Sequence, residues 1–149
     1  MTLIENKKVG LKYEFLEEFS AGLELLGLET KSLRAKNGSL EGSRVLVRGG
    51  EAYLVGATIP PAQIQNAPEE YDPARVRRLL LSRKEILELS EAEAKKGLTI
   101  VPISVYTKGR FIKLRLAIGR GKIKSDKREA IKAREAKIEI GRALRGKDR

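Results

Sequence analysis

The sequence contains no cysteine and no histidine, and these two absences exclude several classes of protein. Without them a disulfide framework and the usual zinc ligand sets cannot form. The Ser-His and Cys-His pairs of nucleophilic catalysis, and most general bases that work at neutral pH, are excluded as well. A carboxylate or lysine enzyme stays open on these grounds. We nevertheless expect a protein that is not an enzyme, with no catalytic residues, no metal and no cofactor.

Long apolar runs are also missing. The first residues, 1–8, lack the apolar core of a signal peptide, and no stretch approaches the roughly 18 apolar residues of a membrane span. We therefore expect a cytoplasmic protein that has no membrane partner. A chain of 149 residues is long enough for one domain, and its core is large enough to be stable without a disulfide or a structural metal.

Positive charge is abundant and unevenly distributed. The chain has 31 basic and 20 acidic residues, a net charge of +11. Residues 121–149 carry 11 basic and 5 acidic side chains, so this last fifth of the chain holds more than half of the excess. Such a surplus attracts polyanions: RNA, DNA, an anionic membrane surface or an acidic protein. The pattern predicts a body over residues 1–120 and a basic C-terminal tail over residues 121–149.

The apolar residues of the tail do not recur at a spacing of three to four, so they predict no stripe that could dock on a core. Pairs of opposite charge at i,i+3, such as Glu129–Lys132 and Glu139–Arg142, are compatible with a helix but contribute only a few tenths of a kcal/mol each. We expect the tail to be disordered when free and helical when RNA neutralises it. A solvated C-terminal helix without a role is the alternative.

Two hairpins dominate the predicted body. Arg44–Arg48 and Glu51–Ala57 flank a Gly-Gly pair that can supply the positive φ of a two-residue turn. The second hairpin joins Leu98–Tyr106 to Arg110–Ile118, with residues 107–109 (Thr-Lys-Gly) as the predicted loop. These segments predict a mainly β fold.

The last predicted strand has two distinct faces. One face belongs in a core, and its residues are Ile112, Leu114, Leu116 and Ile118. The other face carries Phe111, Lys113 and Arg115, a ring and two cations. An ordinary solvated face would look the same. The basic residues nearby, Arg120 and Lys122 among them, favour an RNA-binding surface.

Helix signals flank these strands. Ser82-Arg83-Lys84-Glu85 is a capping box, which predicts a helix from there to about Lys95 that stops at Gly97. Leu28–Lys36 is typical of a shorter helix that Asn37-Gly38 ends. Leu11–Leu26 fits both a strand period and a helix period, so its pattern does not decide between them.

Gly119-Arg120-Gly121-Lys122 superficially suggests a phosphate loop. A Walker sequence needs a glycine at the position of Leu116 and a serine or threonine at the position of Ile123, and both are absent. We interpret the segment as a flexible basic hinge between body and tail.

Several motifs occur together in one order along the chain. They are Asn6-Lys7-Lys8, Ala21-Gly22-Leu23, Glu29-Thr30-Lys31-Ser32-Leu33-Arg34-Ala35, Asp72-Pro73, Arg78-Leu79-Leu80-Leu81, Gly97-Leu98-Thr99-Ile100-Val101-Pro102, Tyr106, Gly121-Lys122 and Asp126-Lys127-Arg128. In this order and at this spacing, over nearly the whole chain, they resemble small protein B, the SsrA-binding protein family of bacteria.

That resemblance implies a fold and a function. The fold would be an oligonucleotide-binding-type closed β-barrel with flanking helices, which makes Leu11–Leu26 a strand region. The protein would be a monomer that binds transfer-messenger RNA (SsrA) and delivers it to ribosomes stalled on mRNA without a stop codon. The tail would occupy the empty mRNA channel and decoding centre, where rRNA phosphates favour a polycation.

The resemblance and the basic face together predict the site residues. The predicted RNA-binding residues of the body are Asn6, Lys7, Lys8, Ser20, Lys31, Arg34, Leu80, Lys113, Arg115 and Arg120. The predicted ribosome contacts of the tail are Gly121, Lys122, Ser125, Asp126, Lys127 and Arg128. Two serines depart from the family pattern: Ser20 replaces an acidic residue, and Ser125 replaces an aromatic or histidine side chain that would stack on a base. Residues 11–12 (Leu-Lys) likewise replace a pair of histidine and an acid.

Three other functions fit parts of the sequence. A ribosomal protein with a tail threaded through folded rRNA would show the same charge. A carboxylate-dependent nuclease would need acids on one wall, and the two acidic groups, Glu17-Glu18 and Glu69–Asp72, lie far apart in the chain. A binder of anionic membranes would need a wide apolar face, which the tail lacks.

Overall fold

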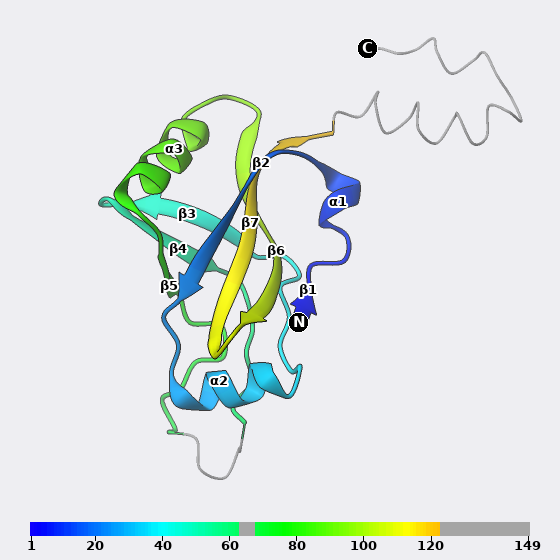
Figure 1. Ribbon diagram of the computed structural model, residues 1–149, viewed down its shortest axis with the longest axis vertical. Coiled ribbons are helices and arrows are strands. Elements are labelled where there is room, and N and C mark those ends of the chain that lie inside the picture. Colours follow the sequence, from blue (N-terminus) through cyan, green and yellow to red (C-terminus); the bar gives the residue numbers. More distant parts are fainter. Residues whose placement is uncertain (63–67, 123–149) are drawn as a thin grey trace, which may run out of the picture.

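The computed structural model of the chain describes residues 1–62 and 68–122. Seven strands and three helices follow one another in these residues (Figure 1). Their bounds are β1 (Thr2–Glu5), α1 (Val9–Lys12), β2 (Tyr13–Leu23), α2 (Gly27–Arg34), β3 (Arg44–Arg48), β4 (Glu51–Val55), β5 (Arg77–Leu80), α3 (Arg83–Glu93), β6 (Leu98–Lys108) and β7 (Phe111–Gly121). No helix among the described residues is long and apolar enough to cross a membrane.

All described strands form one antiparallel sheet in the order β1-β6-β7-β2-β5-β4-β3. The mainly β fold is therefore confirmed, but within the described residues the sheet does not close into a barrel. β1 covers only Ser104–Tyr106 of one edge of β6, and β3 lies close to β6, but no ladder of hydrogen bonds joins β3 to β6 in this part of the chain. The pairing of β1 continues to the first residue, because the Thr107 amide donates to the Met1 carbonyl at 2.9 Å.

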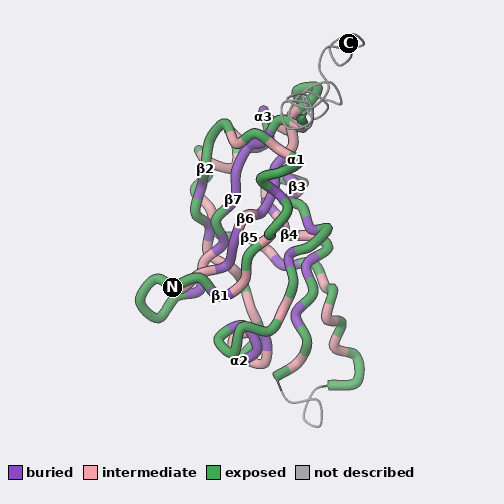
Figure 2. The backbone as a smooth tube through the Cα atoms, turned by 90° about the vertical axis from the view of Figure 1, so that its right-hand side faces the viewer, coloured by how far each residue is buried: buried purple, intermediate pink, exposed green. Residues whose placement is uncertain are grey.

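The centre of the sheet is a ladder of three long strands, β6, β7 and β2. The predicted alternation of β7 is confirmed: Ile112, Leu114, Leu116 and Ile118 are buried in the core. Phe111 on the opposite face is 64% exposed. Figure 2 shows the buried part of the chain along β6 and β7 and the exposed parts on the helices and turns.

Both hairpins are present, and one turn differs from its prediction. Gly49 and Gly50 have φ values of 60° and 80°, as the two-residue turn between β3 and β4 requires. In the second hairpin Lys108 pairs with Phe111, so the loop is Gly109-Arg110 and not residues 107–109. Gly109 supplies the positive φ, at 62°, as the first residue of this two-residue loop and not as the last of three.

The ambiguous segment 11–26 is mostly strand. β2 begins at Tyr13, which confirms the interpretation that the family resemblance gives, while Leu11 and Lys12 belong to the single turn of α1. β7 also continues further than its pattern predicts. Gly121 pairs with Tyr13, and the Lys122 amide donates to the Lys12 carbonyl at 2.9 Å. The prediction of a flexible hinge at residues 119–122 is therefore wrong, because this backbone is tied into the sheet.

The two longer helices cover different parts of the sheet. α3 packs against β6 and β3, and its capping box is formed as predicted, since the Glu85 amide donates to Ser82 Oγ at 3.2 Å. α2 crosses the end of the sheet near the turn between β6 and β7 (Figure 1). It ends at Arg34, two residues earlier than predicted, because Lys36 takes the left-handed conformation with φ 64°.

Candidate nucleic-acid interface

Strand register brings predicted site residues together on the outer face of the sheet. Gly22 of β2 pairs with Leu80 of β5 on one side and with Lys113 of β7 on the other. These three residues therefore form one row across neighbouring strands. A Cβ atom at Gly22 would lie 3.2 Å from the Leu80 Cβ, so the glycine lets Leu80 lean over the centre of the row.

The next row on the same strands pairs Ser20 with Arg115. The Ser20 hydroxyl is hydrogen-bonded to the Tyr106 hydroxyl, which fixes both groups on the surface. Arg115 Nε donates to Glu18 Oε1 at 2.8 Å, and this bond raises the pKa of the Arg115 guanidinium. Arg115 is therefore partly neutralised, whereas no ion pair involves Lys113 within the described residues.

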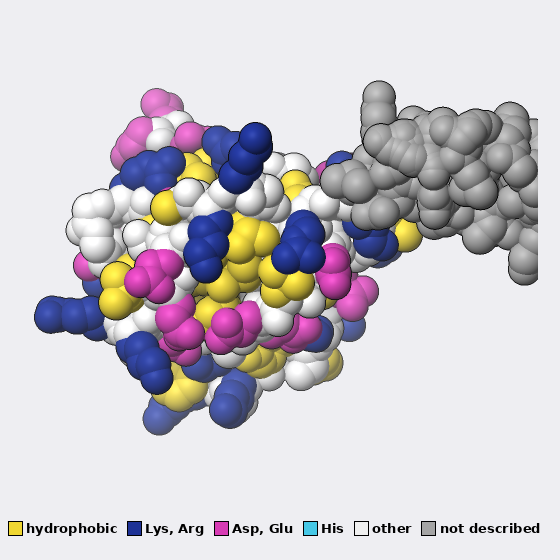
Figure 3. Space-filling view, turned by 90° about the horizontal axis from the view of Figure 1, so that it is seen from above, with side chains coloured by type: hydrophobic (Ala, Val, Ile, Leu, Met, Phe, Trp, Pro, Cys, Tyr) yellow, Lys and Arg dark blue, Asp and Glu magenta, His cyan; other side chains and the backbone are white. Residues whose placement is uncertain are grey.

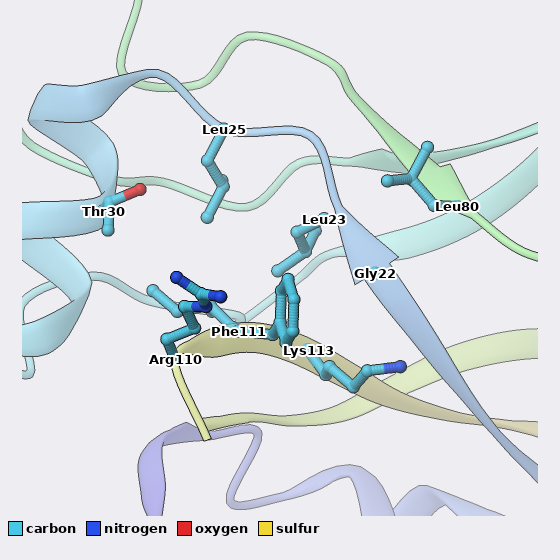
Figure 4. Close-up of a pocket in the computed structure, with 9 residues that line it drawn as sticks. Gly22, Leu23, Leu25, Thr30, Leu80, Arg110, Phe111 and Lys113 are labelled. Carbon is cyan, nitrogen blue, oxygen red and sulfur yellow. The ribbon is translucent and has the colours of Figure 1, made fainter. Parts of the chain in front are cut away.

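A pocket of about 470 Å³ lies at one end of these rows. Figure 4 shows Leu23, Leu25 and the Phe111 ring on its wall. Arg110 and Lys113 lie on either side of this ring. The pocket thus combines an apolar surface with two cations, and it contains no carboxylate.

α2 borders this pocket through Thr30 and is held against the turn of the second hairpin. Arg34 Nη2 donates to the Arg110 carbonyl at 2.9 Å, so this predicted RNA-binding residue also fixes the turn. Lys31 lies exposed on the same helix.

The N-terminal end of α2 is anchored by a buried carboxylate that sequence reasoning did not identify. Glu29 and Arg77 have fully buried side chains, and Arg77 Nη2 lies 2.7 Å from Glu29 Oε2. Arg75 Nη2 donates to Glu29 Oε1 at 2.6 Å, and the Leu26 amide donates to the same oxygen at 2.8 Å. Burial raises the pKa of Glu29, but hydrogen bonds from Arg75, Leu26 and Arg77 and the charge of Arg77 outweigh it and lower the pKa to about 2.

Tyr71 completes this cluster. Its hydroxyl lies 2.7 Å from the Ile59 carbonyl oxygen and 3.0 Å from Glu29 Oε2. Burial and the neighbouring Glu29 carboxylate raise the pKa of Tyr71, so the phenol stays protonated. In the sequence Glu29 is only one charged residue within the motif 29–35. Its partners Tyr71 and Arg77 are 42 and 48 residues away, so the sequence gives no local signal for this cluster.

Other predicted residues lie elsewhere. Asn6 donates through its side chain to the Pro102 carbonyl at 3.0 Å and through its backbone amide to Ile103, so it ties the end of β1 to β6. Lys7 and Lys8 are exposed. Lys8 lines a second pocket of about 230 Å³, whose other basic and aromatic residues are Lys12, Arg44 and Tyr13.

Lys122 is exposed and follows β7 next to Lys12. Arg120 lies near it on β7 and is 3.7 Å from Glu14.

The predicted residues therefore form two groups and not one site. Phe111 begins β7 beside the larger pocket, and Gly121 ends it beside Tyr13, which lines the smaller pocket. Ten residue steps along a strand correspond to about 33 Å. The predicted tail contacts Ser125, Asp126, Lys127 and Arg128 lie outside the described residues.

Figure 3 shows the molecule from the end where α3 lies. Hydrophobic side chains gather there between Lys and Arg side chains, next to a row of acidic ones. Hydrophobic side chains between cations are thus present on this face as well as around Phe111, and such surfaces bind nucleic acids by stacking and phosphate contacts. The fold and the two basic groups define a nucleic-acid-binding protein built on an antiparallel sheet.

Comparisons with known proteins give the family. The family model described as SmpB protein matches residues 3–146. An SsrA-binding protein of Gloeobacter violaceus is 44% identical over 143 residues, which cover 96% of this chain and 93% of the relative. An SsrA-binding protein of Latilactobacillus sakei is 45% identical, with 96% and 91% coverage. The chain belongs to the SmpB family.

A solved structure agrees with this family. It is described as "tmRNA-SmpB: a journey to the center of the bacterial ribosome", and its chain matches with a TM-score of 0.69 and 37% identity. The match covers 86% of this chain and 93% of the solved chain.

Proposed function

We propose that this chain binds transfer-messenger RNA (SsrA) and delivers it to ribosomes stalled on mRNA that lacks a stop codon. The observation that carries the proposal is the row of Leu80, Gly22 and Lys113 beside the larger pocket, on a chain of the SmpB family. A leucine, an exposed ring and cations without an ion pair among the described residues are suited to hold RNA bases and phosphates together on one sheet face.

The second basic group and the tail give the chain further surfaces for the ribosome. Lys8 and Lys12 line the smaller pocket together with Tyr13, which pairs with Gly121 at the end of β7. We infer that residues 123–149, the basic segment that follows, enter the rRNA-lined mRNA channel and decoding centre. Ser125 would offer a hydrogen bond there, without the stacking of a ring.

Crosslinking in the cells of origin tests this function. The full chain should crosslink mainly to one small RNA, and sequencing should identify it as transfer-messenger RNA. A ribosomal protein would instead follow one ribosomal subunit in stoichiometric amount and crosslink to rRNA. If rRNA alone is recovered, the chain is a ribosomal protein and does not deliver transfer-messenger RNA.

A further inference from the structure

Phe111 is the aromatic residue among the large hydrophobic side chains that the described surface exposes, at 64%. It lies at the first position of β7, where the Gly109-Arg110 turn and the ladder to Lys108 fix its backbone. Leu80, which is 47% exposed, lines the same pocket. Clustered exposure of large apolar side chains marks a binding surface.

The pocket beside this ring is of the right size and shape for a small planar ligand. Its volume of about 470 Å³ lies within the range of about 300–1,000 Å³ of ligand-binding clefts. Leu23, Leu25 and the Phe111 ring line it with apolar surface (Figure 4). A flat aromatic group can pack against this surface.

The charges around the pocket select an anionic ligand. Arg110 and Lys113 lie on either side of the ring, and Arg34 joins them by holding the Arg110 carbonyl. None of the residues that line the pocket is acidic. An apolar peptide would gain nothing from this rim, whereas a nucleotide presents a planar base together with a phosphate on each side.

We propose that this pocket holds one unpaired nucleobase of the bound RNA, stacked on the Phe111 ring, with the adjoining phosphates on Arg110 and Lys113. The inference rests on the proposed function and specifies how the same surface grips its RNA. Recognition is of an unpaired nucleotide, because a base within a duplex cannot leave its stack to enter the pocket without an energetic cost.

The absence of tryptophan from the chain allows a direct test. In the full chain, Phe111→Trp introduces a single indole at the proposed stacking position. Its emission should be quenched when full-length transfer-messenger RNA is added, since a stacked base lies against the indole. Leu87→Trp on α3 is the matched control, because Leu87 is similarly exposed, at 58%. Its emission should change little.

Affinity gives the second measurement. Phe111→Ala should weaken binding of transfer-messenger RNA roughly 5- to 150-fold, the range for loss of one stacked base, without changing the salt dependence. Phe111→Trp should bind at least as well as the wild type. Unquenched emission, equal quenching of both tryptophan variants or unchanged affinity of Phe111→Ala each overturns the base pocket.

The outcomes also separate this inference from the function on which it rests. A wild-type chain that does not bind transfer-messenger RNA refutes both. A Phe111→Ala chain that binds this RNA normally but binds ribosomes weakly refutes the base pocket alone, and assigns the pocket to a contact on the ribosome.

Discussion

The cations on the outer face of β2 and β7 differ in what already neutralises them. Arg115 donates to Glu18 at 2.8 Å, whereas Lys113 has no ion pair within residues 1–62 and 68–122. An exposed pair of this kind contributes little to stability, but it reduces the positive potential that an RNA phosphate meets. The two residues looked equivalent in the sequence, because alternation along a strand says nothing about cross-strand partners.

Lys113→Ala should therefore weaken the binding of transfer-messenger RNA and flatten its salt dependence by about one unit of slope, the loss of one phosphate contact. The charge-neutral double variant Glu18→Ala/Arg115→Ala is the control and should bind almost normally. Filter binding at several salt concentrations measures both. If the double variant loses as much slope as Lys113→Ala, Arg115 contacts a phosphate itself.

Glu29 provides the residue-scale test of stability. Its pKa of about 2 in the fold lies below the ordinary value of 4.5, so it binds fewer protons in the folded chain than in the unfolded one. Its contribution is complete above about pH 4.5 and is lost as the pH falls towards 2. Strong acid should therefore weaken the attachment of α2 through this carboxylate.

Glu29→Gln should lower the free energy of unfolding at pH 7 by about 3–5 kcal/mol, because Arg77 then lies buried without its counter-charge. The variant should also lose much of the pH dependence between pH 4.5 and 2. Urea unfolding across this range gives both quantities. Glu24→Gln removes an exposed carboxylate 3.5 Å from Arg78 and should change little. Equal losses in the two variants would contradict the role of the buried cluster.

At the scale of elements, the sequence predicts the helices and strands whose ends are marked by local residues, such as a capping box or a glycine turn. α3 is an example, because Ser82 and Glu85 cap each other through two hydrogen bonds of 3.2 and 3.0 Å. Ser82→Ala should cost about 1 kcal/mol of stability. Ser90→Ala, an exposed position in the same helix, should cost nothing, since alanine has the better helix propensity. Thermal unfolding compares the two, and an unchanged Ser82→Ala would mean that packing alone holds α3.

Elements that depend on distant partners were missed. β1 and β5 have four residues each, too few for a period to stand out, and they exist because β6, β2 and β4 offer them edges. The Gly49-Gly50 turn was predicted in detail, while the loop of the second hairpin was predicted as residues 107–109 and is Gly109-Arg110. Glycine alone does not fix which pair of residues forms the turn.

The candidate site also has parts that the sequence predicted and parts that it did not. Leu80, Lys113 and Gly22 were available from motifs and alternation, but their meeting in one row needs the register of three strands. The Glu29 cluster joins a helix to a segment more than 40 residues away, and no local pattern announces it. Whether the sheet closes likewise depends on a ladder between β3 and β6, which are far apart in the sequence, and none joins them in the described residues.

For the whole molecule, the two basic groups predict a division of labour between body and tail. A truncated chain should end after Lys122 and not within β7, because the Lys122 amide donates a hydrogen bond to the Lys12 carbonyl. We expect this truncated chain to fold and to bind transfer-messenger RNA with only a modest loss. Tagging of nascent chains on stalled ribosomes should stop. Normal tagging by the truncated chain would refute the proposed role of residues 123–149.

The backbone hydrogen bond between Met1 and Thr107 has a practical consequence for the design of tagged forms of the protein. A purification tag or fluorescent fusion placed before Met1 would start beside the end of β6, two residues from the Gly109-Arg110 turn that borders the larger pocket. A fusion at the other terminus would extend the segment proposed to enter the ribosome. A cleavable N-terminal tag, removed before binding is measured, leaves both working surfaces of the protein in their native form.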